Sequence, residues 1–234
     1  MENLVSIISQ IDFFDEDAKK HGAKKTFYAT ETELNQFDIY HRWIGTEPTN
    51  PISDSKRLMF KVAKTVEVTI IDQLARHGFV VPYEEQPHIE FTYNDVPVSG
   101  YIDGEMKDGT IVEIKTFYGD NQLRDVSFGN PHPHYLKQLM IYMYAMNRNF
   151  GKLLYVDRGT GQMFEFNVGR IGTFTFAWGP QHTIVDLEET FKRWERIYKE
   201  HVIPKIEPKS EFLYKHPVDK IDFSKLSTSL VSLM

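Results

Sequence analysis

The chain has no cysteine among its 234 residues. This absence excludes disulfides, thiolate zinc sites and cysteine-ligated iron–sulfur clusters. Any metal ion that the protein uses must therefore be held by oxygen atoms or by imidazole.

Long apolar runs and an excess of basic residues are also missing. No run approaches the roughly 20 apolar residues of a membrane span, and the N-terminus lacks the basic and apolar segments of a secretory signal. We therefore expect a cytoplasmic protein that does not associate with membranes. A formal net charge of −6 argues against coating nucleic acid by bulk electrostatics. A local DNA groove stays compatible with it, because bound metal ions can supply positive charge locally.

The length and the apolar pattern predict a single domain, 1–234. We expect a helical N-terminal region over 1–54, with helix-like patterns at 4–11 and 34–40. A core follows over 55–202, and an extended C-terminal tail occupies 203–234.

The clearest predicted helix spans 55–77 and ends at Gly78. Its apolar stripe repeats every four residues: Leu58, Val62, Val66, Ile70 and Leu74. Glu67 flanks this stripe, so it needs a partner. The alternative is a glutamate that reaches the helix boundary and is solvated.

The remaining pattern predicts further strands and helices. The segment 116–133 is a polar stretch too long for an ordinary connection, and we expect a functional loop there. An antiparallel meander is expected from 79–83, 88–93 and the arm that carries Asp103. Further strands are expected at 153–157, 163–168 and 174–178, and helices at 134–147 and 185–201.

One hairpin carries the candidate chemistry. In its second arm, Glu113 and Lys115 alternate with Val112 and Ile114, so the two charged side chains share a face. The face of Asp103 depends on the register. A two-residue turn would pair Asp103 with Ile114, whereas a three-residue loop with left-handed Gly109 would pair it with Glu113. We predict the second register.

Two carboxylates on adjacent strands suit Mg²⁺ or Mn²⁺, which prefer oxygen ligands. Asp103 and Glu113 are the expected ligands, and the Ile114 carbonyl is placed to add another oxygen. Lys115 can orient or deprotonate an attacking water, or neutralise charge on a phosphate. Glu67 could hold a second ion or a water. These four charged residues are the predicted catalytic set.

A Glu-x-Lys pattern alone is more often a solvated strand face. Here it forms part of an ordered series: a helix glutamate, a strand aspartate, Glu113-Ile-Lys115, and a later helix with Gln138 and Tyr142. The series resembles the PD-(D/E)XK nuclease superfamily, specifically its RecB-like exonuclease branch. The matching motifs are 63–67, 100–103, 113–115 and 138–142, and the resemblance covers roughly residues 55–170.

The resemblance implies a restriction-endonuclease-like core, an α/β (α+β) architecture with a central mixed β-sheet flanked by helices. It further implies dependence on Mg²⁺ or Mn²⁺ and cleavage of DNA phosphodiesters, often from an end or on single strands. It also implies that Gln138 and Tyr142 contact DNA or support the site. Two features depart from the pattern. Ala63 replaces a frequent glycine, and the four cysteines that hold an iron–sulfur cluster in some relatives are missing, so no cluster forms.

Other residues could contact the DNA partner. His134 and Tyr135 begin the second predicted helix, and Arg124 and Lys137 flank the site and could grip phosphates. A solvated charge explains each of the last two nearly as well. Metal binding by His132 and His134 is the less favoured reading of that pair. Aromatic residues could stack on the bases of a single strand: Tyr135, Phe117, Tyr118 and the group Phe174, Phe176 and Trp178. Core packing is the favoured reading of Phe174 and Phe176 and an equal alternative for Tyr135 and Tyr118.

The leading hypothesis is a metal-dependent DNA exonuclease or end-processing nuclease of recombination, repair or replication. The resemblance suggests a phage-encoded protein. A structure-specific or restriction-like endonuclease on the same core is the second hypothesis. The third is a nucleic-acid-binding module without catalysis. That reading expects the loss of at least one of Glu67, Asp103, Glu113 and Lys115, all of which are present.

Overall fold

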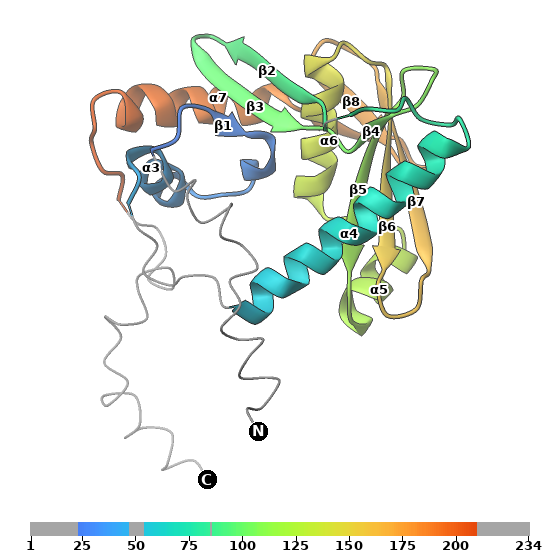
Figure 1. The fold of residues 1–234 in the computed structure, drawn as a ribbon. Coiled ribbons are helices and arrows are strands. Elements are labelled where there is room, and N and C mark those ends of the chain that lie inside the picture. Colours follow the sequence, from blue (N-terminus) through green and yellow to red (C-terminus); the bar gives the residue numbers. More distant parts are fainter. Residues whose placement is uncertain (1–22, 47–53, 85, 210–234) are drawn as a thin grey trace, which may run out of the picture.

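The computed structural model describes residues 23–46, 54–84 and 86–209 (Figure 1). The predicted helix at 4–11 and the tail beyond residue 209 lie outside these ranges. None of the helices within them combines the length and the apolar character needed to cross a bilayer.

The larger sheet has six strands in the order β4-β5-β6-β7-β8-β9. β5 and β6 run parallel and the other neighbours are antiparallel, so the sheet is mixed. Strand β9 was not predicted, because its side chains are mostly exposed and show no alternation of burial. The strands are β4 (Gly104–Glu105), β5 (Ile111–Phe117), β6 (Phe150–Asp157), β7 (Met163–Arg170), β8 (Thr175–Trp178) and β9 (Thr183–Asp186).

A second, three-stranded sheet has the order β1-β3-β2. It comprises β1 (Phe27–Tyr28), β2 (His88–Tyr93) and β3 (Val96–Tyr101). β1 pairs with β3 in parallel and β2 pairs with it antiparallel. The predicted fold class, a mixed α/β core flanked by helices, is confirmed, but the strands divide into two sheets instead of one.

The predicted meander is therefore wrong in one respect. The chain leaves the small sheet after Tyr101 and joins the large one at Gly104, so Asp103 lies at the junction between the sheets. The strand predicted at 79–83 is reduced to one bridge, between Val80 and Met106. Pro82 lacks the N–H that a longer ladder would need.

Within the described ranges, five α-helices flank the sheets: α3 (Gln36–Ile44), α4 (Asp54–Arg76), α5 (Asp120–Ser127), α6 (Pro133–Ala145) and α7 (Glu188–Ile197). A 3₁₀ turn, η1 (Ala29–Glu31), follows β1, and a π-helical turn, η2 (Tyr198–Val202), follows α7. Helix α5 occupies the segment predicted as a loop. It buries Val126 and only part of Leu123, too little apolar surface to give a helical period.

Helix α4 crosses one face of the large sheet (Figure 1). Its Val66, Ile70 and Ile71 pack on Val112 and Ile114 of β5. The predicted apolar stripe is correct only in this part of the helix. Leu58 and Val62, nearer its beginning, are 45% and 46% exposed and do not belong to the core.

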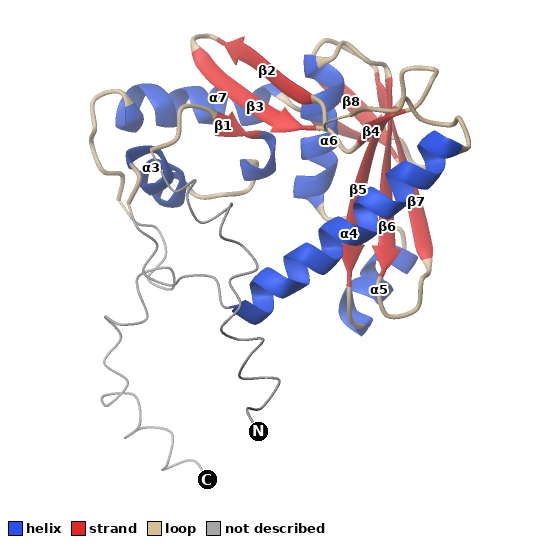
Figure 2. Cartoon of the chain, viewed as in Figure 1, coloured by secondary structure: helices blue, strands red, loops and turns tan. Residues whose placement is uncertain are grey.

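Helix α6 lies against the opposite face of the large sheet. Leu139 and Met143 approach Gly151 of β6 so closely that a Cβ there would lie 2.6 Å from the Met143 sulfur. Because side chains alternate along β5, the face away from α4 carries Glu113 and Lys115. Figure 2 shows β5 between these two helices, so the charged pair of β5 points to the α6 side.

Candidate active site at the edge of β5

The β4–β5 hairpin has the predicted register. Gly104 pairs with Val112 and Glu105 pairs with Ile111, and this register carries Asp103 opposite Glu113. A three-residue loop closes the hairpin, with the Gly109 N–H donating to the Met106 carbonyl at 2.9 Å. Gly109 has a φ of 85°, the left-handed conformation that the bulged loop requires.

Asp103 immediately precedes the short strand β4. Its Oδ2 accepts a 2.8 Å hydrogen bond from the Ile114 N–H, and its Oδ1 accepts a 3.0 Å bond from Gln86 Nε2. In a strand, the N–H and C=O of one residue point to the same edge. The Ile114 carbonyl therefore faces the side of β5 on which Asp103 lies, as predicted for a metal ligand.

Acidic neighbours and burial shape the charge of Asp103. Burial is the main cause that raises its pKa well above the usual range, followed by the charge of Glu113 and by a hydrogen bond with the Glu67 carboxyl. Two carboxyl groups can share a hydrogen bond only if one of them carries a proton. The site therefore holds more negative charge than its own cations balance.

Glu113 is fully buried between two donors. Its Oε1 accepts from Gln138 Nε2 at 2.7 Å and lies 2.5 Å from Lys115 Nζ. Its Oε2 has no hydrogen-bond partner among the described residues. Burial raises the pKa of Glu113, and the charge of Lys115 opposes this shift. A buried carboxylate oxygen without a partner is costly, and a cation is one way to satisfy it.

Lys115 is held in its protonated form. Burial alone would lower its pKa, but the charges of Glu113 and then Asp103 outweigh burial and raise the pKa above the usual value. Its Nζ also lies 5.0 Å from the centre of the Tyr135 ring. Tyr135, one of the predicted DNA contacts, therefore lies beside the predicted catalytic set.

Glu67 reaches the site from α4, on the other side of the β5 edge. Its Oε1 pairs with Lys64, one helical turn earlier, and its side chain is 17% exposed. Together with the Asp103 contact, this pairing shows that Glu67 is not the solvated boundary residue of the alternative reading.

Gln86 is a member of the site that sequence analysis missed. It donates to Asp103 through Nε2 and accepts from Lys64 at 3.0 Å through Oε1, so it joins the two acids into one network. It lies in a connection before β2 and belongs to no periodic pattern. Lys64 could have been found, because residues three apart on a helix face each other.

Gln138 and Tyr142 lie beneath Glu113. The Gln138 amide donates to both Glu113 and the Tyr142 hydroxyl, the latter at 2.9 Å. The two side chains are only 3% and 2% exposed, so neither offers a surface to DNA. Of the two roles expected for them, support of the site is the one that this geometry favours.

Three other predicted DNA contacts, His134, Lys137 and Arg124, differ in their surroundings. Burial lowers the pKa of His134 to about 4, with the charges of His132 and Lys115 adding to the shift. His134 is therefore neutral near pH 7, although it lies near the site. Lys137 pairs with Glu33 at 2.7 Å, and Arg124 is exposed on α5; neither has a described contact with the acids.

The aromatic residues considered for base stacking divide clearly. Phe117 and Phe176 are buried in the core, and Phe174 and Trp178 pack against it. Tyr118 is 69% exposed.

The donor set fits a hard divalent cation. Carboxylate oxygens converge from Glu67, Asp103 and Glu113, and one of these oxygens has no partner among the described residues. Burial, and after it the charge of neighbouring carboxyl groups, raises the pKa of Asp103 and of Glu113. Within the described residues, no three His, Cys, Asp or Glu side chains form a complete metal-binding group. An ion would therefore need a carbonyl, water or substrate oxygens as well.

The fold of the chain matches solved structures. No family model and no curated protein matches the sequence. The crystal structure of LHK-Exo in complex with dAMP matches with a TM-score of 0.52 at 14% identity, over 78% of this chain and 90% of that one. The chain shares its fold with LHK-Exo. LHK-Exo is an alkaline exonuclease from Laribacter hongkongensis. The crystal structure of SSO0001 matches with a TM-score of 0.50 at 14% identity, over 87% and 88% of the two chains.

Proposed function

We propose that the protein is a Mg²⁺- or Mn²⁺-dependent DNA nuclease, an exonuclease or end-processing enzyme that acts on single strands or free ends. The observation that carries this proposal is the convergence of Asp103, Glu113, Glu67 and Lys115 at the β5 edge, with one buried carboxylate oxygen unpaired. The shared fold with LHK-Exo and the four-part resemblance of the sequence to RecB-like nucleases support the proposal.

Each residue has a role that its contacts suggest. Asp103, Glu113 and the Ile114 carbonyl would hold the cation, with Glu67 as a further oxygen donor. The bound cation would supply Lewis acidity toward the scissile phosphate and the attacking water.

Lys115 acts as a cation in this proposal. A lysine that two carboxylates keep protonated is a poor base, so it orients water or neutralises phosphate charge. Gln138 fixes the Glu113 carboxylate through its hydrogen bond, and Gln86 fixes Asp103.

The test uses end-labelled linear DNA and closed circular DNA, each single- and double-stranded, with Mg²⁺, with Mn²⁺ or with EDTA. We expect cation-dependent release of short products from linear DNA and no cutting of circles. Cutting of circles would identify an endonuclease on the same core instead.

Matched variants separate this site from a contaminant. Asp103→Ala and Lys115→Ala should abolish cleavage, whereas Lys192→Ala, which removes a surface pair with Glu188 on α7, should retain it. Full activity of the first two variants, or DNA binding by the wild type without hydrolysis, would contradict the proposal.

A further inference from the structure

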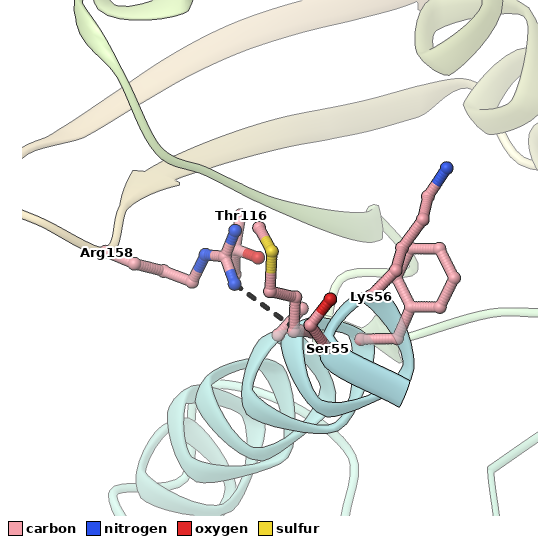
Figure 3. Close-up of a pocket in the computed structure, with 7 residues that line it drawn as sticks. Ser55, Lys56, Thr116 and Arg158 are labelled. Atoms are coloured by element: carbon pink, nitrogen blue, oxygen red, sulfur yellow. Dashed lines mark hydrogen bonds between the residues drawn. The ribbon is translucent and has the colours of Figure 1, made fainter. Parts of the chain in front are cut away.

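A cleft of about 340 Å³ lies under the first half of α4, at the carboxyl-terminal ends of β5 and β6. Its volume falls in the range of ~300–1,000 Å³ that suits small ligands, and the carboxyl ends of parallel strands are a frequent place for ligands. The cleft is separate from the candidate active site: its lining includes none of Glu67, Asp103, Glu113 and Lys115. Figure 3 shows its lining: Ser55, Lys56, Met59, Phe60, Ala63, Thr116 and Arg158.

One end of the cleft is polar. Arg158 reaches toward α4 and lies beside Thr116 (Figure 3), and its Nη1 donates to the Met59 carbonyl at 3.2 Å. Arg158 Nε and Thr116 Oγ1 are buried without a hydrogen-bond partner in the described ranges. Buried donors without partners are rare and costly, so two of them side by side point to a missing acceptor. A phosphate fits best, because its oxygens accept from guanidinium and hydroxyl groups together.

The opposite wall is apolar and exposed. Met59 and Phe60 present 49% and 53% of their surface to solvent, and Ala63 adjoins them. An aromatic ring beside a phosphate-binding arginine is the arrangement by which proteins hold single-stranded nucleic acid, with a base stacked on the ring. Lys56 adds positive charge at the rim, although Figure 3 shows it directed away from Arg158.

We propose that this cleft binds one nucleotide of a single strand, with its phosphate on Arg158 and Thr116 and its base against Phe60. The inference rests on the proposed function and adds a substrate-binding site to it. Thr116 directly follows Lys115 but points to the α4 face of the sheet. A strand that occupies both sites therefore passes the edge of β5 on its way from the cleft to the acids.

Binding is measured first, by fluorescence anisotropy of an internally labelled oligothymidylate in EDTA, so that no cleavage occurs. Arg158→Gln should weaken binding by about 10- to 100-fold, the value of a charge-assisted hydrogen bond. It should also reduce the slope of log affinity against log salt by about 0.7, the effect of one lost phosphate contact on a single strand. Thr116→Val and Phe60→Ala should each weaken binding severalfold.

Arg196→Gln is the matched control, because it removes the same charge from an exposed position on α7. It should change affinity by no more than about twofold. Arg158 also donates a hydrogen bond to the Met59 carbonyl of α4, so its substitution could destabilise the fold. Thermal unfolding of every variant is therefore recorded. Thr116→Val leaves the Arg158 to Met59 bond intact and tests the cleft independently of that bond.

The backbone charge of the ligand is tested with a methylphosphonate oligonucleotide, which is neutral. Arg158→Gln should not weaken binding of this ligand. A titration with inorganic phosphate tests the other source of the same chemistry. If phosphate alone binds the wild type as tightly as the oligonucleotide does, and through Arg158, the ligand is a free phosphate and the strand proposal is overturned.

The two proposals fail separately. If Arg158→Gln and Thr116→Val bind the oligonucleotide as the wild type does, the cleft proposal is overturned, even when the wild type cleaves DNA with Mg²⁺. If the wild type binds through Arg158 but does not cleave, the nuclease proposal fails and the cleft proposal stands. Absence of any oligonucleotide binding by the wild type overturns the cleft proposal.

Discussion

At the scale of single residues, the candidate site concentrates acids that cannot all be ionised together. Glu67 and Asp103 share a hydrogen bond, and Glu113 is buried with one unpaired oxygen. Such an arrangement is unfavourable for folding and favourable for binding a cation, because the cation supplies the charge that the residues lack. Stability and cation binding should therefore be linked in this protein.

The raised pKa of Asp103 gives this linkage a direction. Between about pH 4, the usual value for an unfolded aspartate, and its raised pKa, the folded state binds more protons than the unfolded state. The free energy of unfolding therefore falls as pH rises through this window. Urea unfolding in EDTA should show a larger loss of stability from pH 5 to pH 8 for the wild type than for Asp103→Asn.

Added Mg²⁺ or Mn²⁺ should reduce this pH-dependent loss of unfolding free energy in the wild type and not in Asp103→Asn. The pH dependence of stability should be weaker in the variant but still present, because the pKa of Glu113 is raised as well. Equal pH dependence of the two proteins would show that Asp103 does not carry the excess charge.

At the scale of elements, the hairpin register depends on the conformation of one loop residue. Gly109 adopts a φ of 85°, which glycine and asparagine accept and β-branched residues resist. Gly109→Val should lower the free energy of unfolding by about 1–2 kcal/mol more than Gly109→Asn does. Urea unfolding measures the difference, and cleavage should follow the same order because the register places Asp103 opposite Glu113. Equal stability of the two variants would show that this loop does not fix the hairpin.

Helix α6 and strand β3 depend on a second glycine. A Cβ on Gly100 would lie 2.6 Å from Cε1 of Tyr142, the residue under Gln138. Gly100→Ala should destabilise the fold by about 1–3 kcal/mol through overpacking, and it should lower cleavage by shifting the Gln138 to Glu113 bond. Gly169→Ala is the control, since a Cβ there meets no atom within 4 Å. If the two variants are equally stable and equally active, Tyr142 does not position Gln138.

The elements also show why sequence analysis succeeded in some places and failed in others. The β4–β5 register was predictable because turn chemistry and alternation act over a few residues, from Asp103 to Lys115. Helix α5 was not, because it buries too little apolar surface to leave a period. The exposed first half of α4 was not predictable either: Leu58 and Val62 continue the apolar repeat past the end of the sheet that α4 covers.

At the scale of the whole molecule, the site depends on two sheets and two helices that meet around β5. Glu67 comes from α4, Gln138 from α6, and Asp103 from the junction between the sheets. The order of these residues along the chain indicated that they meet, but nothing local indicated that the strands divide into two sheets. Gln86 was missed for the same reason, because only the tertiary fold brings it to Asp103.

Glu113 offers the most direct test of the central claim, that these residues form a cation-dependent nuclease site. The measurement is the rate of hydrolysis of labelled single-stranded DNA as a function of Mn²⁺ concentration, for the wild type and for Glu113→Gln. Glutamine has nearly the same shape but no charge, so a cation ligand is lost with little change in packing. The variant also loses the ion pair with Lys115, so its thermal unfolding is recorded alongside. We predict a saturable rate for the wild type and no rate above the EDTA background for the variant. Equal saturable rates for the two proteins would contradict the account.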